Sequence, residues 1–161
     1  MNKFREAAGR VEPTPLTRDR VAAALGSMDC QFGRDEDGDC FGNWDGHTFR
    51  FFCVGNEGEI FTVRSFWNPE PPLDMQPQVL QELNQWHGER IWPKAYVNEY
   101  NSKLIISAEH SVDYEHGLTD NQLIQHLQCA INTMIGLFEH LETRFDQWEQ
   151  WVSTSPEEPH A

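Results

Sequence analysis

Apolar residues recur along this chain with two different periods, and the changes between them mark its predicted elements. From Thr17 onward, Val21, Leu25 and Met28 recur at spacings of four and three, which predicts a helix capped by Thr17. Residues 1–15 before it are polar and end in a Pro-Thr-Pro sequence, so we expect them to form a flexible arm.

The next part of the chain favours strands joined by tight turns. Asp-Gly dipeptides at 37–38 and 45–46 and an Asn-Glu-Gly sequence at 56–58 are typical of chain reversals. Aromatic and β-branched residues gather in three segments near these turns: Cys40–Trp44, His47–Val54 and Glu59–Trp67. We therefore expect three or four antiparallel strands in a meander.

A proline-rich connector, a second helix and two further strands follow the meander. Val79, Leu83 and Trp86 lie on one face of the predicted helix, which Gly88 and Pro93 limit at its end. Alternating residues then predict the last two strands, which a tight Asn-Ser turn joins: Lys94–Tyr100 and Lys103–Val112.

The start of the last helix carries the strongest local signal in the sequence. Thr119 and Gln122 form a capping box, and Leu118 and Leu123 occupy the hydrophobic positions around it. The apolar residues that follow continue to Trp148. The pattern predicts an α+β fold with an antiparallel sheet of about five strands packed against helices in the order α-βββ-α-ββ-α. We expect a single domain over 16–151 and an acidic, disordered tail over 152–161.

Two features of this pattern exceed what one buried face requires. Phe52, Ile60 and Phe66 fall on the second face of the predicted sheet, and the apolar stripe of the last helix is too wide around Met134 and Phe138. These five residues form a candidate interaction surface for a second copy of the chain or for another polypeptide. Alternatively, the apolar stripes pack on one another within one chain and need no partner.

Charge and cysteine usage narrow the class of protein. The chain holds 12 Lys and Arg against 26 Asp and Glu, a net charge of −14, which argues against nucleic acid as a partner. We expect no signal peptide and no membrane-spanning helix, because no apolar run is long enough for either. The four cysteines are widely scattered, which favours reduced thiols and a cytoplasmic protein.

The sequence shows no recognisable arrangement for catalysis or for a cofactor. The acidic run at 35–39 lacks the glycine and the glutamate that a calcium loop needs, so it favours an acidic turn. The seven histidines lack metal-ligand spacing, and Glu109 and His110 are expected on opposite faces of one strand. We find no nucleophile motif and no phosphate-binding loop, and we therefore assign no catalytic, cofactor-binding or metal residue.

Several short segments resemble the YbjN-domain proteins, bacterial proteins described as sensory-transduction regulators. The resemblance covers about residues 16–145 and rests on an ordered series of segments: Asp37-Gly-Asp39, Trp44-Asp-Gly46, Phe49–Phe52, Ile91-Trp-Pro-Lys94, Ala108-Glu-His110 and His116-Gly-Leu-Thr119. It implies a fold like that of type III secretion chaperones, often found as a homodimer. It brings no catalytic residues.

The residues and the resemblance together favour a cytoplasmic, non-catalytic module that binds protein, has a chaperone-like or regulatory role and acts as a homodimer. The alternative is a small-ligand or metal-dependent sensor, or an enzyme, with a site assembled from dispersed residues.

Overall fold

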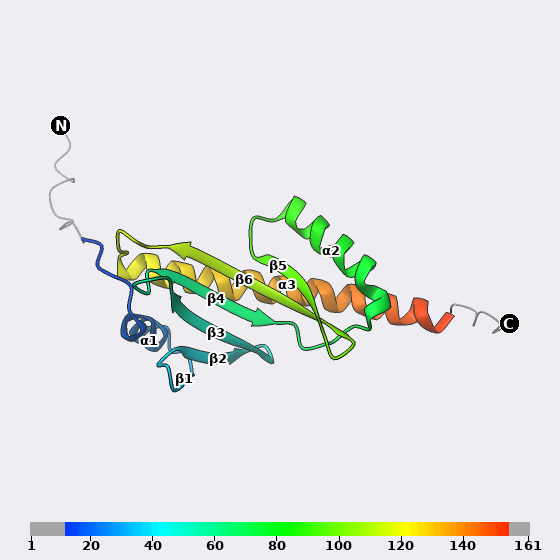
Figure 1. The fold of residues 1–161 in the computed structure, drawn as a ribbon, viewed down its shortest axis with the longest axis horizontal. Coiled ribbons are helices and arrows are strands. Elements are labelled where there is room, and N and C mark those ends of the chain that lie inside the picture. The colour runs from blue at the N-terminus through cyan, green and yellow to red at the C-terminus, as the bar shows by residue number, and fades with distance from the viewer. Residues whose placement is uncertain (1–11, 155–161) are drawn as a thin grey trace.

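A computed structural model describes residues 12–154, with side chains as far as Asp146. Most of the predicted arm and most of the predicted tail lie outside these residues. The elements in chain order are α1 (Arg18–Ser27), β1 (Phe32–Arg34), β2 (Cys40–Trp44), β3 (His47–Val54), β4 (Ile60–Phe66), the 3-10 turn η1 (Leu73–Met75), α2 (Gln76–Glu89), β5 (Lys94–Tyr100), β6 (Lys103–Asp113) and α3 (Asp120–Thr154) (Figure 1). The predicted α+β class with an antiparallel sheet is confirmed.

The strands form one six-stranded sheet in the order β1-β2-β3-β4-β6-β5. After β4 the chain leaves the sheet through α2 and returns at the outer edge as β5, and β6 then pairs on both sides. Ile60 of β4 lies opposite Asp113, and Lys94 of β5 lies opposite Glu109. β6 therefore runs through the sheet between β4 and β5.

The strand β1 was not predicted and raises the count from about five strands to six. It has only three residues, with Gly33 at its centre, so it offers no alternation of apolar and polar side chains. It pairs with β2 at the edge of the sheet.

Two-residue turns set the register of two hairpins. Asp45 and Gly46 have φ values of 51° and 80°, and Asn101 and Ser102 have φ values of 48° and 59°. Positive φ at both central residues is the conformation that suits the twist of a two-residue hairpin.

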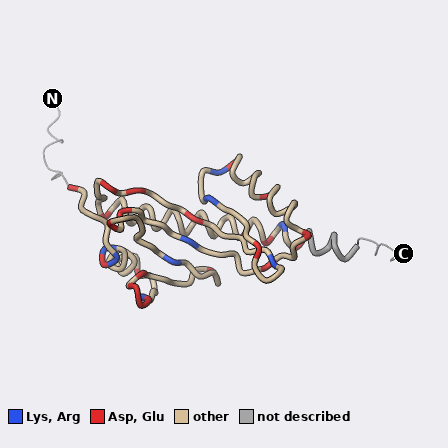
Figure 2. The backbone as a smooth tube through the Cα atoms, in the orientation of Figure 1, with Lys and Arg blue, Asp and Glu red and all other residues tan. Residues whose placement is uncertain are grey.

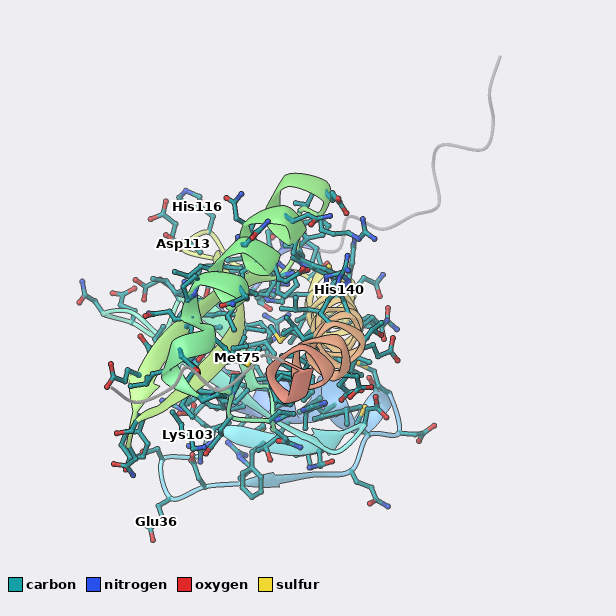
Figure 3. The ribbon with its side chains drawn as sticks, turned by 90° about the vertical axis from the view of Figure 1, so that its right-hand side faces the viewer. Glu36, Met75, Lys103, Asp113, His116 and His140 are labelled. Carbon is teal, nitrogen blue, oxygen red and sulfur yellow. The ribbon has the colours of Figure 1, made fainter. Side chains whose placement is uncertain are left out.

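All three helices of the described residues lie on one face of the sheet. The sheet curls around α3, with β2 and β6 on different sides of it in the end-on view (Figure 3). α1 contacts α3, and α2 packs on β5 and on α3, where His140 lies 5.5 Å from the ring of Trp86. The second face of the sheet carries no helix (Figure 1).

The core lies between the sheet and α3. Phe49, Phe51 and Phe61 of the sheet are at most 1% exposed. The facing side chains of α3 are equally buried, and they include Leu127, Met134, Leu137, Phe138 and Leu141. Between Leu123 and Leu141, the apolar stripe of α3 is therefore covered within one chain, by the sheet and the two other helices.

This packing corrects part of the candidate interaction surface. Met134 is 0% exposed and Phe138 is 1% exposed, and the ring of Phe138 lies 4.5 Å from that of His47. Both residues belong to the core and cannot meet a partner in this state.

The start of α3 is fixed to the N-terminal part of the described chain. The predicted capping box is present: Thr119 N–H donates to Gln122 Oε1 at 2.8 Å and Gln122 N–H donates to Thr119 Oγ1 at 3.2 Å. Thr14 exchanges backbone hydrogen bonds with Leu118, and Arg20 donates to the Leu118 carbonyl. The last residues of the predicted arm are thus attached to the fold.

Replacing Phe138 by alanine should destabilise the protein by about 3–5 kcal/mol, because it removes a fully buried ring and leaves a cavity. Urea unfolding followed by circular dichroism measures this. The matched control is Leu80→Ala on α2, since Leu80 is 49% exposed and its loss should change the free energy of unfolding by less than about 0.5 kcal/mol. Equal midpoints for the two variants would contradict the placement of Phe138.

Candidate functional site

The face of the sheet that carries no helix exposes large apolar side chains. Phe41 is 37% exposed, Val54 is 45% exposed and Phe66 is 39% exposed, and Phe52 and Ile60 are half-buried beside them. Apolar side chains on the solvent side of a sheet are a common feature of interaction sites. We call these five residues and the strands that carry them the open face.

The open face brings together some of the predicted interaction residues and separates others. Val54 lies directly opposite Ile60 in the sheet, and Phe52 lies opposite Thr62. Phe66 is six residues further along β4, about 20 Å from Ile60. Phe52, Ile60 and Phe66 therefore share one face, with Ile60 and Phe66 at opposite ends of β4 and Phe52 on β3 nearer to Ile60, whereas Met134 and Phe138 lie in the core.

Glu109 of β6 lies directly opposite Arg64 of β4 and Lys94 of β5, in the middle of the open face. Figure 2 shows that acidic and basic positions both occur along the strands of the sheet. Arg64 donates to its Oε2 from Nε at 2.9 Å and lies 2.8 Å away through Nη2, and Lys94 donates to Oε1 at 2.7 Å. The hydroxyl groups of Tyr96 and Ser111 lie at 3.4 and 3.3 Å from the carboxylate. The Glu109 side chain is only 9% exposed.

The partners of Glu109 keep its carboxylate ionised. Burial by itself raises the pKa of Glu109, but the hydrogen bonds and charges of Lys94 and Arg64 outweigh it and hold the pKa below its ordinary value. Arg64 also lies 5.6 Å from the centre of the Phe52 ring. The middle of the open face is thus a satisfied polar network between two apolar ends.

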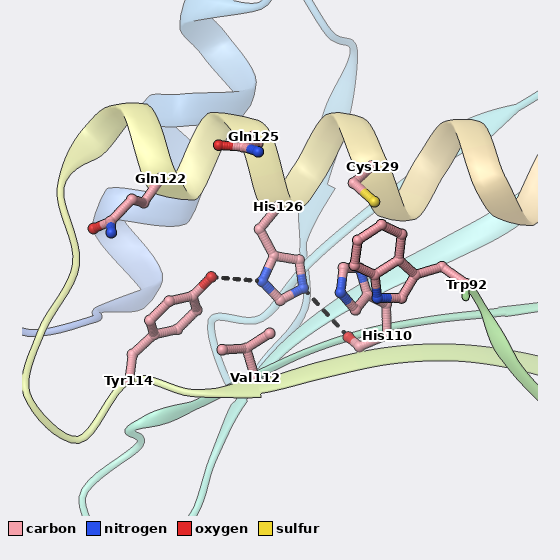
Figure 4. A pocket seen from close by; sticks show the side chains of 8 residues that line it. All are labelled: Trp92, His110, Val112, Tyr114, Gln122, Gln125, His126 and Cys129. Carbon is pink, nitrogen blue, oxygen red and sulfur yellow. Dashed lines mark hydrogen bonds between the residues drawn. The ribbon is translucent and has the colours of Figure 1, made fainter. Parts of the chain in front are cut away.

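A cavity of about 190 Å³ lies on the other side of β6, against the first half of α3 (Figure 4). Its walls include the rings of Trp92, His110, Tyr114 and His126. The His110 and His126 rings are 4.2 Å apart, and Trp92 lies 5.6 Å from His110. The Tyr114 hydroxyl lies 3.0 Å from His126 Nδ1, and His126 Nε2 lies 3.4 Å from the carbonyl of His110.

Burial keeps the two histidines of this cavity uncharged. It lowers the pKa of His126 to about 4, with a further contribution from the neighbouring His110, and it also lowers the pKa of His110. In neutral His126, the contacts fit a Tyr114 hydroxyl that donates to Nδ1 and an Nε2–H that donates to the His110 carbonyl. Burial raises the pKa of the Cys129 thiol in the same cavity, so the thiol is a weak nucleophile and the site suits binding better than covalent chemistry.

Sequence reasoning placed Glu109 and His110 on opposite faces of one strand but missed what surrounds them. Glu109 meets Arg64 and Lys94 only because β6 inserts between β4 and β5, and local periodicity does not reveal that order. His126 read as an ordinary histidine, although its position three residues after Leu123 and four before Ala130 places it on the buried side of α3. That position is a signal that could have marked it as buried.

The acidic run at 35–39 forms a turn that its own neighbours satisfy. Asp35 Oδ1 accepts hydrogen bonds from the backbone N–H groups of Asp37 and Asp39, and Asp39 pairs with Arg18 at 2.6 Å.

Within residues 12–154, no group of three or more His, Cys, Asp or Glu side chains is placed to hold a metal ion. Over the same part of the chain, no helix combines the length and the apolar character that crossing a bilayer requires.

Comparison with known families settles the membership that the sequence segments indicated. Residues 17–143 match the YbjN family model, which carries the description "Putative bacterial sensory transduction regulator". The chain belongs to the YbjN family. No protein of curated function matches the sequence.

Two solved structures share the fold of this YbjN-family chain. One is the crystal structure of YbjN from E. coli, named as "a putative transcription regulator", with a TM-score of 0.70, 12% identity and coverage of 84% of this chain and 96% of that one. The other is the HopA1-SchA chaperone-effector complex, with a TM-score of 0.52, 18% identity and coverage of 78% and 99%. The predicted chaperone-like fold is confirmed.

The pKa of His126 predicts a loss of stability in mild acid. The unfolded chain binds a proton at His126 near pH 6.5, whereas the folded chain binds it only near pH 4, so stability falls as the pH falls through this window. The loss should reach about 3 kcal/mol for this group. Urea unfolding at intervals from pH 7.5 to 4.5 measures it.

Two variants test whether His126 in the cavity causes this loss of stability in acid. His126→Phe should flatten the pH dependence, whereas His116→Gln should keep it, because the His116 side chain is 91% exposed. If His126→Phe keeps the full slope of the parent protein, the neutral state of His126 is not its cause.

Proposed function

We propose that this YbjN-family protein is a non-catalytic module that binds another polypeptide on its open face and has a chaperone-like or regulatory role. The observation that carries the proposal is the group of apolar side chains on the sheet face that carries no helix. Phe41, Val54 and Phe66 are more than a third exposed there. A partner that covers them would gain about 25 cal/mol for each Å² of apolar surface removed from water.

The polar centre of the open face suits a protein partner. Glu109 is already bonded to Arg64 and Lys94, so a partner can cover this carboxylate without leaving its negative charge unpaired. Aromatic residues and arginine are the residue types that contribute most to protein interfaces, and Phe52 and Arg64 lie together here.

The comparisons support a partner of this class. One structure of similar fold is a chaperone bound to an effector, and the family description is that of a regulator. Fold similarity alone does not transfer function, so the open face carries the proposal and the similarity supports it.

We also propose that the protein acts as a homodimer in the cytoplasm. In the sheet, β5 pairs with β6 on one side only, and its outer edge is a place where a second copy can add. Leu80 of α2, the helix that packs on β5, is 49% exposed. All four cysteines are free thiols, as in proteins of a reducing compartment.

Phe52→Asp and Phe66→Asp should weaken partner binding and leave the fold intact, since neither side chain lies in the core. The tagged parent protein and both variants are used to recover partners from a lysate of the source organism, with folding checked by circular dichroism. The recovered partner is then purified and titrated. Each variant should weaken its binding at least tenfold, as expected for an interface hot spot.

Gln128→Asp is the matched control for this experiment, because it adds the same charge at an exposed position of α3, away from the open face and from the β5 edge. It should bind the partner as the parent does. A partner that binds the parent, Phe52→Asp and Phe66→Asp with equal affinity would place its site elsewhere.

Light scattering coupled to gel filtration should give a mass of twice 18.7 kDa at micromolar concentration. The mass should fall to that of one chain on dilution or in a variant with charge at an exposed position of the β5 edge, Asn98→Lys. A single-chain mass for the parent at micromolar concentration would exclude the homodimer without affecting the proposed partner site.

A further inference from the structure

The cavity between β6 and α3 has no role in the proposed binding of a polypeptide on the open face. We propose that it binds a small uncharged aromatic molecule that carries an N–H or O–H group. The size of the cavity, its aromatic walls and its unpartnered polar groups each support this ligand class.

The size of the cavity matches one substituted aromatic ring. Its volume is about 190 Å³, and an engineered apolar cavity of about 150 Å³ in another protein holds a benzene molecule. A metal ion would need ligands at about 2.0–2.6 Å, and residues 12–154 hold no group of side chains placed to provide them.

The walls of the cavity present aromatic faces from two elements and a loop. His126 comes from α3, His110 from β6, and Trp92 from the loop before β5 (Figure 4). The His110 ring lies between the other two, 4.2 Å from His126 and 5.6 Å from Trp92. The histidine rings cover one another, whereas Trp92 is 42% exposed, so a flat aromatic ligand can stack on the free surface of Trp92, which contributes beyond the area that it buries.

Polar groups at the cavity are without partners, which favours a ligand that can form hydrogen bonds. Neither ring nitrogen of His110 is hydrogen-bonded to another described residue; Nδ1 is sealed from solvent and from the cavity, so Nε2 is the nitrogen that a ligand can reach. At the mouth, the Gln125 amide has no hydrogen-bond partner within the described residues. Buried polar groups are normally satisfied, so His110 is a group that a ligand would complete.

No charged side chain lines the cavity, which argues for an uncharged ligand. Its polar lining consists of histidine, tyrosine, glutamine and cysteine side chains, and both histidines are neutral near pH 7. A carboxylate or phosphate would enter without a cation to balance it, which burial makes costly. Phenol is a suitable test ligand because it is one ring with one O–H group.

Thiol labelling tests whether phenol enters the cavity of the full-length protein. Cys129 lines the cavity, whereas Cys30 is a similarly half-buried thiol outside it. Saturating phenol should slow the alkylation of Cys129 by iodoacetamide several-fold and leave the rate at Cys30 unchanged. Titration followed by ligand-observed NMR should give a Kd on the order of 1 mM or lower.

Comparison of phenol with toluene tests the polar contact separately from packing. His110→Phe keeps a ring between Trp92 and His126 but removes the hydrogen-bonding nitrogens, so it should weaken phenol binding by about three- to tenfold and leave toluene binding unchanged. Gln125→Ala should weaken phenol binding in the same direction. Gln128→Ala, an exposed position on the same helix that does not line the cavity, should not.

Two results would overturn the proposal. The first is an alkylation rate at Cys129 that phenol, at concentrations up to its solubility, does not change. The second is equal loss of phenol and toluene binding in a folded His110→Phe variant, which would show that His110 provides packing only. In the first case a partner's aromatic side chain becomes the better occupant, and protection of Cys129 by the purified partner would show it.

Discussion

The packing of α3 into the curled face of the sheet is the interaction on which the rest of the structure depends. One helix provides the facing half of the core for β3, β4 and β6, and α1 and α2 then cover its flanks. Because all three helices gather around this one contact, the opposite face of the sheet receives none of them (Figure 1). The open face is therefore a consequence of how the core is built, and the same helix whose burial stabilises the chain leaves the proposed binding surface free.

The strand β6 connects this core to both candidate sites. Its side chains alternate between the two faces, so Glu109 enters the polar network of the open face while His110 lines the cavity beside α3. A ligand that shifts His110 and a polypeptide that covers Glu109 would thus act on adjacent residues of one strand. The two sites are physically close enough to influence each other without a long chain of contacts between them.

The elements of this fold are largely encoded locally, and the sequence predicts them well. The aromatic and β-branched segments and the capping box at Thr119 gave five of the six strands and the start of the long helix, because periodicity and capping depend on near neighbours. The strand around Gly33 was missed because it is short and lacks alternation, and its existence depends on pairing with β2.

The sites were predictable only in part, since they depend on which elements meet. An apolar second face could be read from Phe52, Ile60 and Phe66, and all three lie there. The width of the stripe around Met134 had two explanations, another helix or another subunit, and periodicity cannot choose between them. Because α1 and α2 contact α3, the explanation that holds is that other helices of the same chain cover the stripe. The network of Glu109 needs strand order, which is a non-local property.

The two edges of the sheet differ, and this difference limits how copies of the chain can assemble. β1 is a three-residue edge, and a Cβ atom at Gly33 would lie only 2.6 Å from Cζ of Phe41, so that edge is short and tightly packed. β5 offers seven residues at the opposite edge. Pairing of β5 with β5 of a second copy would use the long edge of both chains and leave only short ones. Growth by edge pairing then stops at a closed twofold assembly, and open-ended fibres are disfavoured by the geometry of the sheet itself.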